Sequence, residues 1–139
     1  MVGLVVATHG RLAAEMVLTA EQIVGKLPQC ATVAIEPGLS PLEIRDHLKQ
    51  AVDSVDQGEG VVVLADLFGG TPCKESLLLC HQRNIEVLAG VNLPMLLKAH
   101  SLRSEAMSLP DLAHSIEFAA RKTITCVTDL VRDSQPARP

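Results

Sequence analysis

Residues 61–72 read VVVLADLFGGTP, and their pattern is the main basis for predicting the fold. The first five residues are apolar and mostly β-branched, and a run this short predicts an interior parallel strand over 61–65 rather than a helix. Two glycines then favour a tight turn, and a helix start follows, with Thr71 as the N-cap and Pro72 as the first helical residue. The stretch therefore predicts a strand, a glycine-rich turn and a helix that continues to about Gln82.

The same strand and helix signals repeat along the rest of the chain. Further strands are predicted over residues 2–7, 31–35 and 85–89. Helices are predicted over 12–24, from the capping box of Ser40 and Glu43 to Val55, in a short segment from Pro94, and from Ser108 to about Arg121. Strands that alternate with helices at this spacing predict an α/β fold, in which one open, mainly parallel four-stranded sheet carries helices on both faces. We expect the strand order 2-1-3-4 and a single domain over residues 1–131.

The C-terminal part of the chain permits two interpretations. The β-branched residues of 123–130 allow a fifth strand, and the length of the segment also allows a helix that continues the preceding one. Residues 132–139 are expected to form a flexible tail.

Composition and charge narrow the classes of function. The chain has 139 residues and is 47% hydrophobic, yet its apolar runs are too short to span a bilayer, and its first residues read as a buried strand rather than a secretion signal. The net charge of -4, without a basic cluster, and the absence of Trp and Tyr argue against nucleic-acid binding. The four cysteines form no C-x-x-C pair, which favours reduced, buried thiols and a cytoplasmic location.

Two polar residues follow strands that the predicted order makes neighbours. In open parallel sheets, function collects at the carboxyl ends of the strands where the strand order reverses. His9 follows the first strand there, and Asp66 follows the third strand, which lies about 4.8 Å away. A carboxylate that accepts the proton of Nδ1 fixes the histidine tautomer and leaves the Nε2 lone pair free to attack phosphorus. Thr8 and Gly10 flank the histidine, and the glycine leaves room for a bulky group beside the ring.

The turn at Gly69, Gly70 and Thr71 predicts an anion site beside this pair. It precedes a helix N-terminus, where unpaired amide N–H groups and the helix dipole favour a phosphoryl group. Each feature also has a simpler interpretation when it is taken alone: a loop histidine, glycines that permit a tight turn, a threonine that only caps a helix. Asp66 could also be a phosphorylated aspartate of the receiver type, but a receiver places acidic residues after its first strand, where this chain has His9.

Other reactive side chains give weaker signals. Cys73 falls at the predicted helix start, where the dipole could favour a thiolate, so a thiol-based enzyme is an alternative, although no Cys-centred phosphate loop accompanies it. Arg11 could steer a phosphate from the first helical turn. The remaining histidines fall in predicted helices and share no metal-ligand spacing, so no metal site is predicted. They are His47, His81, His100 and His114.

Three segments together resemble the enzyme IIA component of the mannose family of the bacterial phosphoenolpyruvate-dependent sugar phosphotransferase system. They are VVATHG at 5–10, VLADLFGGTP at 63–72 and AGVNLPML at 89–96. Their order and spacing match the family over about the first 125 residues. The resemblance implies that His9 accepts a phosphoryl group from the phosphohistidine of the carrier protein HPr and passes it to a IIB component, while Asp66 orients the ring.

The resemblance also assigns roles around this pair. It implies that the phosphoryl oxygens are held by Gly69, Gly70 and Thr71, and it implies no metal or organic cofactor. A further set of residues is expected to shape the pocket: Thr8, Gly10, Phe68, Asn92 and Pro94. The chain departs from the family at Lys74, where an asparagine is common, and this lysine adds positive charge near the expected phosphoryl group.

Two expectations concern partners. The family implies a homodimer, in some members with a C-terminal strand exchanged between subunits, and residues 123–130 could form such a strand. Because the 139 residues show one domain without a fused IIB module, an alternative function is a stand-alone regulatory protein. In that case the phosphorylation state of His9 would control binding to a partner outside transport.

Overall fold

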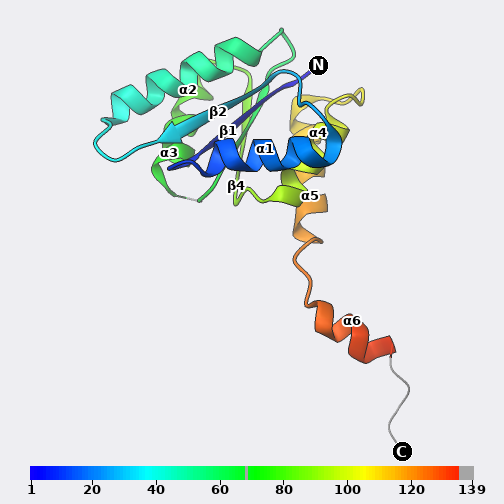
Figure 1. Ribbon diagram of the computed structural model, residues 1–139. Coiled ribbons are helices and arrows are strands. Elements are labelled where there is room, and N and C mark those ends of the chain that lie inside the picture. Colours follow the sequence, from blue (N-terminus) through cyan, green and yellow to red (C-terminus); the bar gives the residue numbers. More distant parts are fainter. Residues whose placement is uncertain (68, 135–139) are drawn as a thin grey trace, which may run out of the picture.

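The computed structural model describes residues 1–67 and 69–134 of the chain (Figure 1). Its strands are β1 (Gly3–His9), β2 (Cys30–Ile35), β3 (Val61–Ala65) and β4 (Ile85–Ala89). Its helices are α1 (Leu12–Val24), α2 (Pro41–Val55), α3 (Thr71–Leu79), α4 (Leu93–Leu102), α5 (Leu109–Arg121) and α6 (Val127–Ser134). All strand pairs are parallel, in the order β2-β1-β3-β4, which confirms the predicted α/β fold and strand order.

Helices cover both faces of the sheet (Figure 1) because successive side chains of a strand point to opposite faces. Leu4 and Val6 of β1 belong to the core on the face covered by α1, α4 and α5. Val5 and Ala7 belong to the core on the other face, under α2 and α3. The two central strands are therefore buried on both faces, and their carboxyl ends meet at one edge of the sheet.

Hydrogen bonds at the helix starts fix where the chain turns. Ser40 and Glu43 form the predicted capping box of α2, in which the Ser40 hydroxyl accepts from the Glu43 amide at 3.1 Å. The start of α3 differs from the prediction, since Gly70 and not Thr71 is the N-cap. Gly70 has extended backbone at φ -73° and ψ 167°, whereas Thr71 already belongs to the helix, so Pro72 is the second helical residue.

The end of α3 also differs from the prediction. The helix ends at Leu79 rather than near Gln82, so His81 lies in a turn and not in a helix. The Cys80 amide bonds to the carbonyl of Leu77 at 3.2 Å. This tighter bond closes the last turn and lets the chain leave toward β4.

The C-terminal segment resolves the choice between strand and helix within the single chain. Residues 124–126 have no regular structure, and α6 then forms a separate helix that lies away from the sheet (Figure 1). In this structure residues 123–130 therefore form neither the fifth strand nor a continuation of α5, because the irregular residues 124–126 separate the two helices. Residues 132–134 belong to α6, whereas the rest of the predicted tail, 135–139, lies outside the described residues. Within residues 1–67 and 69–134, no helix is long and apolar enough to cross a membrane.

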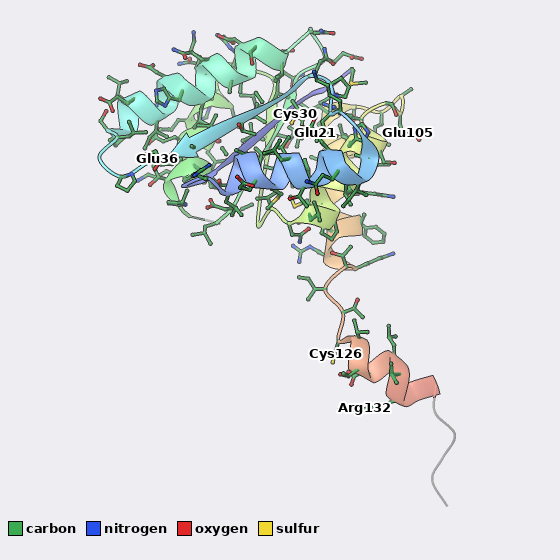
Figure 2. The ribbon with its side chains drawn as sticks, viewed as in Figure 1. Glu21, Cys30, Glu36, Glu105, Cys126 and Arg132 are labelled. Carbon is green, nitrogen blue, oxygen red and sulfur yellow. The ribbon has the colours of Figure 1, made fainter. Side chains whose placement is uncertain are left out.

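The cysteines differ in exposure. Cys73 is buried and Cys30 and Cys80 are half-buried, but Cys126 is exposed, so the prediction of buried thiols is wrong for Cys126. Figure 2 shows Cys126 just before α6, on the segment that connects α5 to α6 and lies outside the core. Burial raises the pKa of Cys30 to about 11, against the opposing positive charge of Arg103. Burial likewise raises the pKa of Cys80 above its ordinary value.

Arg103 is a buried charged residue that lies at the end of the sheet where β1 and β2 begin. Its guanidinium donates to the carbonyl of Gln29 at 3.1 Å, to that of Val2 at 3.5 Å, and to that of Pro28. The residue is 3% exposed, and burial lowers the pKa of its side chain. Arg103 therefore joins the end of α4 to the start of β1 and to the loop before β2.

Candidate functional site

His9 and Asp66 meet at the carboxyl edge of the sheet, as the strand order predicts. His9 is the last residue of β1, and Asp66 follows β3, whose Ala65 pairs with Ala7 of β1. The ring atom Nδ1 of His9 lies 2.9 Å from Oδ2 of Asp66. The same Oδ2 accepts the main-chain amide of His9 at 3.0 Å, and Oδ1 accepts the amide of Leu67 at 3.0 Å. Asp66 thus fixes both the backbone and the ring of the histidine.

The carboxyl group of Asp66 is charged at neutral pH. Burial by itself raises its pKa, but the hydrogen bonds from the His9 amide and ring, together with the attraction of the ring whenever it is protonated, outweigh burial and hold the pKa of Asp66 below its ordinary value. Because a carboxylate only accepts hydrogen bonds, Nδ1 of His9 must carry the proton. The neutral ring therefore has its lone pair on Nε2.

Nε2 of His9 is accessible. The His9 side chain is 48% exposed, whereas that of Asp66 is 12% exposed. In the part of the chain that the structure describes, no side chain or backbone group hydrogen-bonds to Nε2. The arrangement presents a nucleophilic nitrogen to solvent with a carboxylate behind it.

The glycine turn lies directly against the ring. A methyl group built on Gly70 would lie 3.3 Å from Cε1 of His9, the carbon bonded to both ring nitrogens. Gly69 adopts φ +79°, a left-handed conformation that favours glycine, and the Gly70 amide bonds to the carbonyl of Leu67 at 3.3 Å. The predicted neighbourhood of His9 and the glycines is therefore present, and it depends on the missing side chain at Gly70.

The first turn of α3 offers amide donors beside that ring. The Lys74 amide bonds to the carbonyl of Gly70 at 2.9 Å, as expected for the first intrahelical bond. Among the described residues, the amides of Thr71 and Cys73 have no hydrogen-bond acceptor. Free amides at a helix N-terminus favour a bound anion. Thr71 contributes a helical amide here rather than the capping hydroxyl that the sequence predicts.

Thr8 and Gly10 set the turn that carries His9. The Thr8 side chain is fully buried, and its hydroxyl accepts the amide of Ala13 at 2.8 Å, which ties β1 to the first turn of α1. Gly10 adopts φ +57°, and its amide donates to the carbonyl of Ile35 at 3.0 Å. Thr8 therefore shapes the site through the backbone and does not line it.

Asn92 and Pro94 lie in the loop and helix beyond β4. The Asn92 side chain caps α4 by accepting the amide of Met95 at 2.9 Å. The Val91 amide bonds to the carbonyl of Ala65 at 2.9 Å, which places this loop beside the residue that precedes Asp66. Asn92 thus holds the loop next to the site, and Pro94 is exposed in the first turn of α4. The predicted pocket residue Phe68 lies outside the described residues.

The weaker candidates are placed as follows. Cys73 is 4% exposed, so its thiol is not accessible to a substrate. This burial argues against the alternative of a thiol-based enzyme. Arg11 and Lys74 are exposed, and among the described residues neither forms an ion pair. Across residues 1–67 and 69–134, no group of three or more His, Cys, Asp or Glu side chains could hold a metal ion.

One contact near the site was not predicted from the sequence. Glu75 of α3 is buried and forms an ion pair with Arg45 of α2, at 3.0 Å between Nε and Oε2. The two residues are far apart in the sequence and on different helices. Only the apolar-face position of Glu75 within α3 could have signalled a buried partner.

Comparison with known proteins agrees with this fold. The family model EIIA-man, described as the PTS system fructose IIA component, matches residues 3–117. The phosphotransferase enzyme IIA component YadI of Escherichia coli is 31% identical over 121 residues, which cover 86% of this chain and 83% of that protein. The PTS component EIIA from Streptococcus agalactiae has a similar structure, with a TM-score of 0.85 and 26% identity, covering 93% of this chain and 99% of that one.

The mannose-specific EIIAB component of the Escherichia coli PTS is a longer relative. It is 29% identical over 112 residues, which cover 80% of this chain and 35% of that protein. The fold and these matches define a IIA-type component of the sugar phosphotransferase system. Within that class, the chain belongs to the EIIA-man family of mannose- and fructose-type IIA components.

Proposed function

We propose that the chain is a phosphoryl carrier that accepts phosphate from phospho-HPr on His9 and passes it to a IIB component. The observation that carries this proposal is the His9–Asp66 pair, with Nδ1 bound to the carboxylate at 2.9 Å and the His9 side chain 48% exposed. A phosphoryl carrier needs a nucleophilic nitrogen that forms a bond to phosphorus and can later give up the phosphoryl group. This pair supplies such a nitrogen.

The proposed transfer exchanges one P–N bond for another. The Nε2 lone pair of His9 forms a bond to phosphorus while the P–N bond of the donor phosphohistidine breaks, and the electron pair of that bond returns to the donor ring. The His9 ring becomes positively charged because Nδ1 keeps its proton. The Asp66 carboxylate, which accepts that proton in a hydrogen bond, stabilises the charge. The reverse sequence of bond changes delivers the group to the acceptor.

The N-terminus of α3 is proposed to bind the transferred phosphoryl oxygens. Gly70 lies against Cε1 of His9, and the next amides along the chain, those of Thr71 and Cys73, have no acceptor among the described residues, which supports binding of the oxygens of a group on Nε2. Gly69, Gly70 and Thr71 are the proposed phosphoryl-binding residues. Thr8, Gly10, Asn92 and Pro94 are proposed to shape the site around them, and Phe68 is proposed from the sequence alone.

A IIB acceptor and a homodimer complete the proposal. The longer relative is named an EIIAB component, which supports a IIB partner for a IIA chain.

Ile124 is 84% exposed, and Val127 and Leu130 of α6 are also exposed, which supports burial of the segment 124–130 against a second copy. Sedimentation at micromolar concentration tests the dimer. We also propose that the chain acts in the cytoplasm as one domain over residues 1–131.

Phosphorylation by purified components tests the function. The chain is incubated with phosphoenolpyruvate, enzyme I and HPr, and the acid-labile phosphate is mapped by mass spectrometry. We expect one label on His9, none in His9→Ala, and wild-type labelling in the control variant His114→Ala, which changes an exposed histidine of α5. Label that remains in His9→Ala contradicts the proposal. A IIB protein that removes the label supports the transport role, and the regulatory alternative predicts a partner whose binding depends on phosphorylation instead.

A further inference from the structure

An ion pair joins α2 and α3 close to the candidate site. Nε of Arg45 lies 3.0 Å from Oε2 of Glu75. The Glu75 side chain is only 6% exposed, whereas that of Arg45 is 39% exposed. A buried carboxylate is costly unless it is paired, so this contact strongly favours one placement of α3 against α2.

The placement of α3 matters because its N-cap, Gly70, lies against the His9 ring, and the amides of its first turn follow directly in the chain. The helix is short, at nine residues, and its N-cap Gly70 has no side chain to hold the helix start. Glu75 lies one helical turn beyond Thr71, or about 6 Å along the helix axis. Its ion pair is therefore a side-chain contact that anchors the start of α3 from the neighbouring helix.

We infer that Arg45 and Glu75 are positioning residues, which hold the first turn of α3 against His9 and so set the rate at which His9 gains and loses a phosphoryl group. This inference rests on the proposed function. Neither residue touches the ring. They act through Gly70, where a methyl group built on the glycine would lie only 3.3 Å from Cε1 of His9. A shift of α3 by a fraction of an ångström changes the distance from its amides to the transferred group.

A second ion pair between the same two segments provides a matched control. Nε of Arg83, in the turn after α3, lies 3.1 Å from Oδ1 of Asp53 near the end of α2. Asp53 lies eight residues after Arg45, or about 12 Å further along α2 and away from His9. Both pairs join an arginine Nε to a carboxylate, but the Asp53 carboxylate is 45% exposed and also pairs with Lys49 at 3.5 Å, and only the Arg45–Glu75 pair involves a residue of α3.

The experiment compares Arg45→Met with Arg83→Met, each of which keeps an apolar stem and removes one guanidinium. Rates of phosphoryl transfer from phospho-HPr are measured over a range of HPr concentrations. We expect Arg45→Met to lower kcat about tenfold with KM within about twofold, because misplaced groups affect the reacting step. Arg83→Met is expected to stay within about twofold of wild type in both. Arg45→Lys, which keeps the charge, is expected to recover part of the lost kcat.

Two outcomes would overturn the inference. A loss confined to KM would mean that Arg45, which is partly exposed, contacts the donor protein instead. Equal losses in Arg45→Met and Arg83→Met would mean that any loosening of α2 and α3 has this effect. If Arg45→Met does not fold, as judged by thermal unfolding, the milder variant Glu75→Gln takes its place with the same expectations.

A readout without phosphate separates this inference from the proposed function. In the unphosphorylated protein, NMR shifts of His9 Cε1 and of the Thr71 and Cys73 amides are expected to move in Arg45→Met and to stay unchanged in Arg83→Met. If these shifts move but the wild-type chain takes no label from phospho-HPr, the proposed function fails while the positioning contact stands. If the chain is labelled normally and the shifts do not move, the inference fails alone.

Discussion

The carboxylate of Asp66 acts on His9 at the scale of single atoms. Oδ2 accepts the ring proton at 2.9 Å and the main-chain amide at 3.0 Å, and Oδ1 accepts the Leu67 amide at 3.0 Å. These bonds fix one tautomer of the ring, and the exposed nitrogen is the one that carries the lone pair. The choice of nucleophilic atom thus depends on one side chain.

Replacing that carboxylate should reverse the tautomer. In Asp66→Asn the amide can donate to Nδ1, which moves the ring proton to Nε2 and removes the nucleophile. We expect phosphorylation of His9 to slow at least about 100-fold. Transfer kinetics and 15N NMR of the ring check both effects. Asp56→Asn is the control, because Asp56 also accepts amides, those of Gly58 and Gly60, but follows α2 at the other edge of the sheet. A normal tautomer in Asp66→Asn would contradict the argument.

The ionisation of Asp66 also predicts a dependence of stability on pH. Hydrogen bonds from His9 outweigh burial and lower the folded pKa of Asp66, so folding favours its charged form. The resulting stabilisation is present above the unfolded pKa of about 3.9 and is lost as the pH falls through the lower folded value. NMR titration of the carboxyl carbon should give a midpoint below the ordinary range. Between neutral and acid pH, the free energy of unfolding measured in urea should fall less in Asp66→Asn than in wild type. An equal fall in both proteins would contradict the assignment.

At the scale of elements, the sequence predicts a helix best where its start carries side-chain signals. The Ser40 and Glu43 capping box and the helix start at Ser108 were predicted correctly, because a local side-chain hydrogen bond decides each of them. The start of α3 was wrong by one residue, since a glycine cap leaves no side-chain signal and Thr71 resembles a cap. The sequence left residues 123–130 open between a strand and a continuing helix, because their β-branched residues suit a strand and the length of the segment suits a helix.

The capping box of α2 gives a prediction at this scale. Ser40→Ala removes the acceptor for the Glu43 amide, and we expect it to lower the free energy of unfolding by about 1 kcal/mol. Ser54→Ala, in the last turns of the same helix, removes only a bond to the carbonyl of Ala51 and should change stability by less than about 0.5 kcal/mol. Urea denaturation of both variants checks the difference, and equal effects would show that the cap does not hold the helix start.

At the scale of the whole molecule, the site could be predicted from the sequence because parallel strands bring their ends together. His9 and Asp66 are far apart in the chain, yet the order of the strands is enough to place them side by side. The contacts of Arg103 and of Glu75 could not be predicted in this manner. They depend on how helices pack over the sheet, which no local pattern specifies.

The buried side chain of Arg103 is expected to contribute to the stability of the whole domain. Arg103→Met leaves the carbonyls of Val2, Pro28 and Gln29 without their shared donor, and we expect it to lower the free energy of unfolding by about 2 kcal/mol or more. The same change in Arg121→Met removes an exposed pair with Glu117 and should cost less than about 0.5 kcal/mol. Chemical denaturation measures both. A loss at Arg103 no greater than at Arg121 would mean that solvent replaces the buried donor.

The double use of Oδ2 of Asp66 has a mechanical consequence. Its two bonds close a small cycle through Cα, Cβ and Cγ of His9, so rotation about χ1 or χ2 breaks at least one of them. A ring and a main-chain amide bonded to the same oxygen keep the side chain in one rotamer, so the ring does not turn toward an approaching molecule. In the proposed function, the donor or acceptor protein must therefore approach the fixed ring along the direction of the Nε2 lone pair.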